Sequence, residues 1–202
     1  MPQLRAVLDE SYKELDEMMA FTAGVEDRLN RCLREGTIPD ADLVDAIAVC
    51  KIRCIDVAVQ RVHKLRLEVG SYALMHGTGY ELVDMFLCCK FAEGDSRILQ
   101  QKLARDRLKA VAKGGVGAAV AGAFDKEGRK ALLLASKLKP AGRDLKKLAV
   151  AMDKNWKDIY ALSERIEQRH MRDGVKSSFI ESAVQRLAPA SVDFDNDWKE
   201  KI

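Results

Sequence analysis

A polar stretch with two carboxylates precedes an apolar-periodic run near the middle of the chain. In "FAEGDSRILQQKLARD", residues 91–106, Glu93 and Asp95 flank Gly94, and Ser96 follows. A carboxylate or hydroxyl at the start of a helix caps its free N–H groups, which accounts for Asp95 and Ser96. Capping leaves Glu93, which lies before the glycine and outside the predicted helix, without a structural explanation. A carboxylate held away from water can act as a general base.

The cysteines and histidines do not form a metal-binding pattern. The cysteines are odd in number, lie on apolar faces and include an adjacent pair poorly placed for a disulfide: Cys32, Cys50, Cys54, Cys88 and Cys89. This usage predicts a reducing intracellular compartment, the cytoplasm or, if a presequence has been removed, the mitochondrial matrix. Cys50 and Cys54 share one helical face, but the histidines are not spaced to complete a zinc site, so we expect no metal.

Apolar residues recur at helical spacing from the amino terminus onward. The run over residues 4–32 predicts a long first helix. Gly36 can close it in a left-handed conformation, and Pro39 cannot extend it. Asp40 or Asp42 is placed to cap a second helix.

The second predicted helix runs from about residue 43 to "MHGTGY", residues 75–80, where Gly77 and Gly79 permit positive φ. Its apolar positions face the core. Its periodicity places four cationic side chains on the outside: Lys51, Arg53, Arg61 and Lys64.

Further helices follow at short intervals. Asp95 or Ser96 caps a third, whose predicted buried face is Ile98, Leu99, Leu103 and Leu108. Others are predicted over residues 126–139, 143–172 and 177–188. Long helices joined by short breaks predict an all-α fold, an antiparallel up-down bundle with a four-helix core and additional C-terminal helices. We expect the bundle over residues 1–113, a helical extension packed on it or continuing it over 114–188, and a polar tail over 189–202.

"KFAEGDSRILQQKLARD", preceded by "SYALMHGTGY" and by two long helices, resembles the C-terminal helical domain of the acyl-CoA dehydrogenase and acyl-CoA oxidase superfamily. The resemblance covers roughly residues 1–113. It implies that Glu93 is the base that takes the α-proton of an acyl thioester while hydride leaves the β-carbon for FAD, and that Gly94 lets the backbone pass close to cofactor or substrate. It also implies an FAD-contacting loop made of His76, Gly77, Thr78 and Gly79.

Enzymes of that superfamily hold FAD between this bundle and a β domain, with a further α domain ahead of it. The chain has neither, so we expect it to be inactive alone and to need both domains from another polypeptide for acyl-CoA oxidation. An alternative is a non-catalytic scaffold or assembly subunit that uses its helical faces to bind a protein partner or a second copy. A third class is a carrier with an acyl-chain cavity.

Charge and hydropathy exclude two other classes. The net charge is +3, with 34 basic and 31 acidic residues, so the overall field is too weak to predict nucleic-acid binding. No apolar run approaches the ~18 residues that a transmembrane helix needs.

Overall fold

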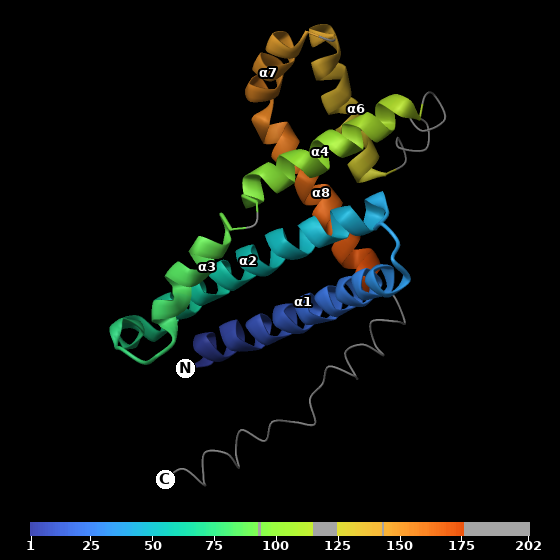
Figure 1. The fold of residues 1–202 in the computed structure, drawn as a ribbon. Helices are drawn as coiled ribbons and strands as arrows, with labels where there is room; N and C mark the ends of the chain where they lie inside the picture. The colour runs from blue at the N-terminus through green and yellow to red at the C-terminus, as the bar shows by residue number, and fades with distance from the viewer. Residues whose placement is uncertain (93, 115–124, 143, 176–202) are drawn as a thin grey trace.

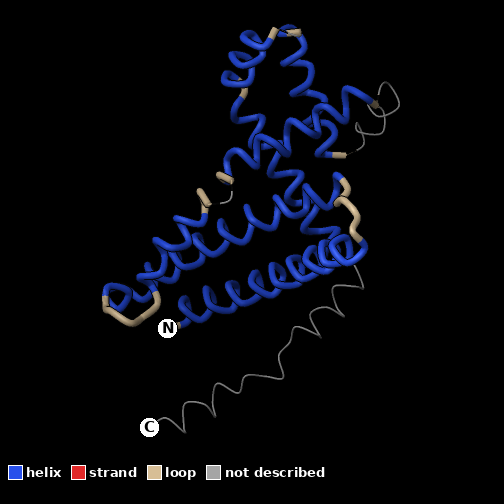
Figure 2. The backbone as a smooth tube through the Cα atoms, viewed as in Figure 1, coloured by secondary structure: helices blue, strands red, loops and turns tan. Residues whose placement is uncertain are grey.

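The computed structural model describes residues 1–92, 94–114, 125–142 and 144–175. Within these ranges the regular structure is entirely helical, with seven α-helices, three short 3-10 helices and no strand (Figure 2). The predicted all-α fold is therefore confirmed. The predicted helix over residues 177–188 and the tail over 189–202 lie outside the described residues.

The first two helices form a long hairpin. Helix α1 (Pro2–Glu35) and helix α2 (Ala41–Val69) pack along each other and run in opposite directions (Figure 1). Gly36 ends α1 in the left-handed conformation, with φ of 64°, and the Asp40 carboxylate caps α2 by accepting a 2.7 Å hydrogen bond from the Leu43 N–H. Both helix ends follow the sequence prediction, because each is set by local backbone chemistry.

Helix α2 ends earlier than predicted. It stops at Val69, where Gly70 takes a φ of 59°, instead of continuing to residues 75–80. A 3-10 helix (η1, Gly70–Leu74), a turn and a second 3-10 helix (η2, Tyr80–Leu82) lead into the short helix α3 (Val83–Cys89). Helix α3 folds back along α2 (Figure 1).

The remaining helices form a second group that crosses the hairpin. Helix α4 (Ser96–Lys113) packs against α6 (Lys126–Leu138) and α8 (Trp156–Val175), and a 3-10 helix (η3, Lys139–Ala141) and helix α7 (Leu145–Lys154) complete an arch above them (Figure 1). Residues 143–172 were predicted as one helix, but Asn155, with φ of −108°, separates α7 from α8. These contacts do not establish the order of an up-down four-helix bundle, which stays a prediction.

One hydrophobic core joins the hairpin to the second group. Helix α8 contacts α1, α2 and α4, and its buried side chains Ile159, Leu162 and Ile166 belong to the same cluster as Val49 and Ile52 of α2. In α4, Leu103 is fully buried and Leu99 and Leu108 are half-buried, as predicted. Ile98 was expected in this face, but that prediction was wrong, because Ile98 is 60% exposed.

A buried carboxylate ties together the three helices of the second group. Glu127 of α6 is only 3% exposed. Its two oxygens lie 2.6 Å from Arg107 Nε of α4 and 2.7 Å from Arg169 Nε of α8. A carboxylate can be buried at tolerable cost when both its oxygens meet guanidinium donors in this way. The pairing therefore fixes how α4, α6 and α8 approach one another.

Arg61 is a second charged group that lies inside the structure. The sequence places it on the outer face of α2, but its side chain is only 10% exposed and is enclosed by two carboxylates of α1. Its Nε donates to Glu14 over 2.5 Å, its NH1 donates to Glu10 over 2.6 Å, and its NH2 also donates to Glu14. The prediction was wrong because periodicity assigns cations to solvent, whereas here the guanidinium joins the two helices of the hairpin.

None of the helices in the described part of the chain combines the length and the apolar character that crossing a bilayer would require.

Replacing Arg61 with Met should destabilise the protein, because it leaves the carboxylates of Glu10 and Glu14 facing each other without their cation. We expect the thermal midpoint to fall by roughly 3–8 °C. Lys64→Met is the matched control, since Lys64 lies on the same helix, 3.8 Å from Glu10, and is half exposed. This control should change the midpoint by about 2 °C or less. Equal effects of the two substitutions would contradict the structural role of Arg61.

The contribution of Arg61 should also depend on pH. Hydrogen bonds from Arg61 lower the pKa of Glu10 and of Glu14 below the ordinary value of 4.5. Because these pKa values are lower in the folded state than in the unfolded state, the stabilisation is fully present above pH 4.5 and is lost as the pH falls through them. The difference in thermal midpoint between wild type and Arg61→Met should therefore be constant near neutrality and shrink below pH 4.5. A difference that grows on acidification would exclude this explanation.

Candidate functional site

The residues that the sequence singles out lie in the segment between α2 and α4. This segment forms two glycine-containing turns at opposite ends of α3 (Figure 1). The first turn contains residues 76–79 and the second contains Gly94. Helix α3 has seven residues, which corresponds to a length of about 10 Å, so the two turns are separate features of the surface.

The first turn is held by the glutamate that follows it. Gly77 and Gly79 have φ of 79° and 85°, so both need the conformational freedom of glycine. The Gly77 N–H donates a 2.8 Å hydrogen bond to Glu81 Oε1, and Thr78 Oγ1 donates over 3.0 Å to the Met75 carbonyl. The result is a closed turn whose backbone conformation matches the expectation for both glycines.

His76 and Glu81 supply the charge of this turn. The His76 side chain is fully exposed, and its Nδ1 lies 3.9 Å from Glu81 Oε1. Hydrogen bonds from its own backbone N–H and from the Gly77 N–H hold the pKa of Glu81 below its ordinary value. Glu81 is therefore an anion at neutral pH, and it was not among the residues selected from the sequence.

The second turn joins α3 to α4. Gly94 has φ of 105°, a conformation that other residues rarely adopt, and a Cβ at this position would lie 3.8 Å from Leu99. Asp95 caps α4 by accepting a 2.6 Å hydrogen bond from the Arg97 N–H, which confirms the predicted cap. The Ser96 N–H donates over 3.0 Å to the Lys90 carbonyl. Glu93, the predicted base, lies outside the described residues.

The ammonium of Lys51, in α2, forms hydrogen bonds with the backbone of the second turn. Its ammonium donates to the carbonyl of Ala92 over 2.5 Å, to that of Gly94, and to that of Lys90 over 3.5 Å. A lysine has three N–H donors and no acceptor, so three carbonyls can use its full capacity. The prediction that Lys51 points outward from α2 was therefore wrong, because its side chain bonds the backbone on both sides of position 93.

A second contact between α2 and the same turn is an ion pair in which α2 supplies the carboxylate and the turn supplies the ammonium. Lys90, directly after α3, lies 2.7 Å from Asp56 Oδ1 of α2, and both side chains are partly buried. Lys51 and Asp56 are five residues apart on α2, and both contact Lys90. Lys51 donates to the backbone carbonyl of Lys90, and Asp56 pairs with its ammonium. The position of the turn relative to α2 is thus fixed by two contacts of different type.

The described residues do not by themselves fit FAD. In the first turn, the Gly77 N–H that a phosphate would use is already bonded to the Glu81 carboxylate, and this negative charge would repel a diphosphate. His76 is open to solvent, and nothing lies within 4 Å of a Cβ built on Gly77 or Gly79, so the turn offers no enclosing wall. Any flavin site that includes these residues needs further protein around it.

The environment of one thiol, that of Cys50, makes it unreactive. Burial raises the pKa of Cys50 to about 12, which leaves its thiol protonated at neutral pH. Cys54 Sγ lies 3.4 Å from Thr22 Oγ1. Among the residues that the structure describes, no three His, Cys, Asp or Glu side chains gather closely enough to hold a metal ion.

Comparison with known proteins identifies no relative of this chain. No family model matches the chain, no curated protein is similar to it in sequence, and no solved structure matches its fold. The relation to the acyl-CoA dehydrogenase and oxidase superfamily therefore remains a prediction from sequence resemblance.

Lys51→Met should loosen the second turn without unfolding the helices. Loss of the ammonium leaves the carbonyls of Lys90, Ala92 and Gly94 to solvent, so amides of residues 90–96 should exchange with deuterium about tenfold faster. Lys64→Met, on the exposed side of the same helix, should leave this exchange unchanged. Unchanged exchange in Lys51→Met would mean that the turn does not depend on Lys51.

Proposed function

We propose that the chain is a helical module of the acyl-CoA dehydrogenase and oxidase type that is inactive alone and whose flavin site is completed by another polypeptide carrying the N-terminal and β domains. In this proposal Glu93 is the catalytic base, and His76, Gly77, Thr78, Gly79 and Gly94 contact the cofactor. The sequence resemblance supplies the type of chemistry. The structure contributes a reason to expect a partner.

The observation that carries the proposal is the exposed apolar surface that begins just before the first turn and continues along α3 to the second. Large apolar side chains are exposed throughout this segment, and Met85 at its centre is 65% exposed: Leu74, Met75, Leu82, Met85, Phe86, Leu87 and Phe91. We call these residues the α3 patch. Clustered exposure of this kind marks a surface that binds another molecule. The α3 patch adjoins both turns that the resemblance assigns to FAD.

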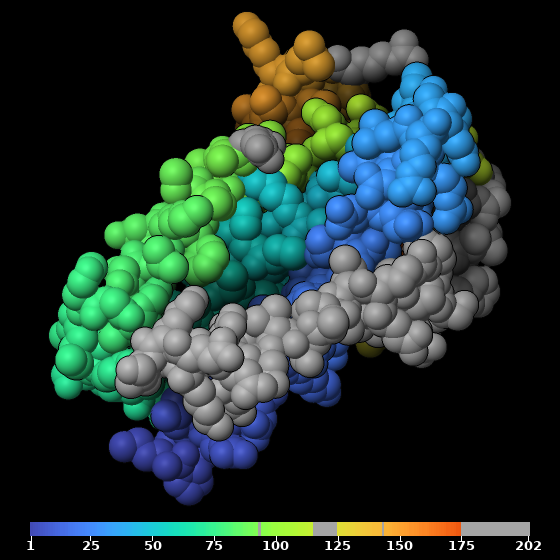
Figure 3. Space-filling view, turned by 60° about the horizontal axis from the view of Figure 1, so that its bottom comes forward, coloured from blue at the N-terminus to red at the C-terminus, as the bar shows by residue number. Residues whose placement is uncertain are grey.

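The shape of this side of the molecule agrees with a docking role. Figure 3 shows the segment around α3 (green) and helix α1 (blue) rising on either side of α2 (teal). Among the described elements, α3 packs mainly against η2 and α2, and Met85 on this helix is 65% exposed. A β domain seated on this side would cover apolar surface and add a wall beside both turns.

The positive-φ glycines also favour the proposal. Gly77, Gly79 and Gly94 all adopt conformations that a side chain would strain, and the first two have open space where a Cβ would be. Bare backbone at two turns, beside an apolar surface, suits a place where another polypeptide and a cofactor approach closely.

A scaffold subunit is the second candidate, and it rests on the bond between the Gly77 N–H and Glu81. This bond satisfies the first turn internally, which a structural turn needs and a cofactor loop does not. In a scaffold the α3 patch would still bind a protein partner, whereas Glu93 would have no chemical role.

Reconstitution distinguishes the two functions. The chain is mixed with FAD and with an acyl-CoA dehydrogenase from which the C-terminal bundle has been removed, and the complex is isolated by size exclusion. We expect it to retain flavin, seen by visible absorbance, and to oxidise an acyl-CoA. Glu93→Gln should keep the flavin and lose at least about a thousandfold in turnover, because the base is absent.

Met85→Asp tests the α3 patch in the same assay, since a charge at its centre should prevent association. Val150→Asp is the matched control, because Val150 of α7 is also an exposed apolar residue but lies outside the patch. A scaffold would be identified by three results together. Met85→Asp would abolish association, the wild-type complex would retain no flavin, and Glu93→Gln would leave association unchanged. Failure of wild type to associate with any such partner would contradict both candidates.

A further inference from the structure

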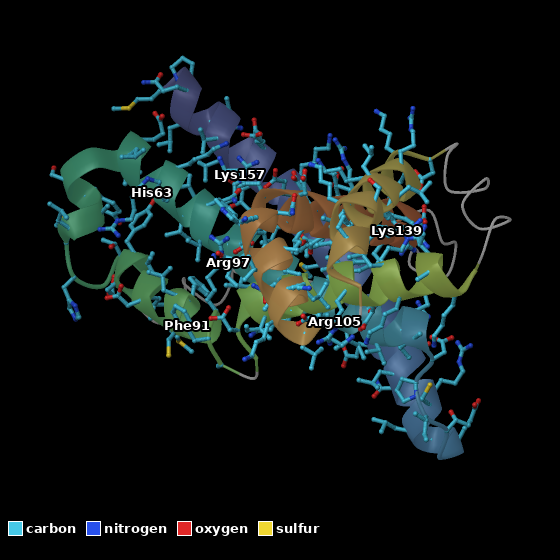
Figure 4. All side chains as sticks on the ribbon, turned by 90° about the horizontal axis from the view of Figure 1, so that it is seen from above. His63, Phe91, Arg97, Arg105, Lys139 and Lys157 are labelled. Carbon is cyan, nitrogen blue, oxygen red and sulfur yellow. The ribbon has the colours of Figure 1, made fainter. Side chains whose placement is uncertain are left out.

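A polar cavity lies where α2, α4 and α8 meet, and neither the sequence resemblance nor the proposed function uses it. Its volume is about 460 Å³, within the range of small-molecule sites. It is lined from α2 by Arg53 and Asp56, from α4 by Arg97 and Gln100, and from α8 by Tyr160 and Glu167. Figure 4 shows Arg97 at the start of α4 and Lys157 at the start of α8 on the same side of the molecule.

The cavity carries unneutralised positive charge. Its cations are Arg53, Lys90, Arg97 and Lys157. Lys90 is neutralised by Asp56. In the described part of the chain, no carboxylate lies within ion-pair distance of the other three. These three side chains converge on one opening from three helices, so the cavity favours an anion.

The acidic residues of the cavity do not cancel this charge. Glu167 is 3% exposed, and burial raises its pKa, whereas hydrogen bonds from Gln100 and Ser163 and the charge of Arg53 lower it. Its Oε1 accepts hydrogen bonds from Ser163 Oγ over 3.0 Å and from Gln100 Nε2 over 3.2 Å. Glu164 is exposed at the rim. The buried base of the cavity is therefore a hydrogen-bonded polar surface, and the carboxyl groups that line the cavity, three in number, are fewer than its four cations.

Aromatic rings stand beside the cations. The Arg97 guanidinium lies 5.0 Å from the centroid of the Tyr160 ring, and the Lys157 ammonium lies 5.5 Å from that of Trp156. The two rings meet edge to face, with centroids 6.0 Å apart, and Gln101 Nε2 donates over 3.1 Å to the Tyr160 hydroxyl. Each cation lies over one face of its ring, so a planar anionic ligand that pairs with these cations would meet the ring surface that they leave uncovered, and Trp156 is 50% exposed.

We propose that this cavity binds a phosphorylated aromatic ligand of the nucleoside phosphate class, with the phosphates against Arg53, Arg97 and Lys157 and the ring against Tyr160 and Trp156. Guanidinium pairs recognise phosphate through several parallel hydrogen bonds, and aromatic side chains stack on a base without regard to its identity. Ser96 also lines the cavity, but it is buried and its hydroxyl donates to the Lys90 carbonyl over 3.4 Å, so it supports the wall of the cavity. The site is independent of the flavin chemistry proposed above, since it uses none of the residues assigned to that function.

The two tryptophans of the chain, Trp156 and Trp198, allow a direct test with ADP as the probe. In a Trp198→Phe variant of the full chain, Trp156 is the remaining tryptophan and reports on the cavity. ADP should quench its fluorescence saturably, and adenosine and inorganic phosphate, which each lack one half of the ligand, should bind at least about tenfold more weakly.

Substitutions in the same background locate the binding. Arg97→Ala and Arg53→Met should each weaken ADP binding at least about tenfold. Arg105→Ala is the matched control, because Arg105 is also an arginine of α4, is exposed, and lies outside the cavity. It should bind ADP as the parent does. Circular dichroism of each variant excludes unfolding as the cause of a loss.

Three results would overturn the proposal. The first is the absence of saturable quenching by ADP. The second is equal binding of ADP and inorganic phosphate, which would indicate a simple cationic patch. The third is an equal effect of Arg97→Ala and Arg105→Ala on ADP binding, which would place ADP outside the cavity.

Discussion

The structure around both proposed sites depends on the ammonium of Lys51. This group reaches from α2 to the carbonyls of Lys90, Ala92 and Gly94 and so sets where the chain turns from α3 into α4. The same turn carries position 93 and positions Lys90 and Ser96 at the edge of the polar cavity. Together with the ion pair between Asp56 and Lys90, this cation fixes the geometry of the candidate catalytic turn and of one wall of the cavity.

Charge and apolar surface are distributed in an unusual way in this chain. Arg61, Glu127 and Glu167 are buried and hydrogen-bonded between helices, Glu127 to Arg169 and Glu167 to Gln100, whereas large apolar residues of the α3 patch face solvent. Buried ion pairs add little net stability but define which helices meet and at what register. The helices can therefore be held in a specific arrangement while an apolar surface remains free to bind a partner.

The sequence predicts best where structure is local. Gly36, Asp40 and Asp95 act at helix ends as expected, because a left-handed glycine or a carboxylate cap depends on a few neighbouring residues. The positive φ of Gly77 and Gly79 was predicted for the same reason. The second helix was predicted too long, because nothing in the sequence distinguishes Gly70, where the helix ends, from a glycine within a helix. The break at Asn155 has no glycine or proline to mark it.

The candidate site was harder to predict, because its important contacts join distant residues. Lys51 and Arg61 have the spacing of solvated cations, and only the packing of α1 and α3 on α2 shows that they bond across helices. The central claim is that the α3 patch binds a flavin-binding partner. The most direct test places a photo-crosslinking amino acid at Phe91, in the α3 patch, and mixes the chain with an acyl-CoA dehydrogenase from which the C-terminal bundle has been removed. The account predicts a crosslink to the β domain from this position and none from position 150 of α7. Crosslinks from position 150 with none from Phe91 would contradict it.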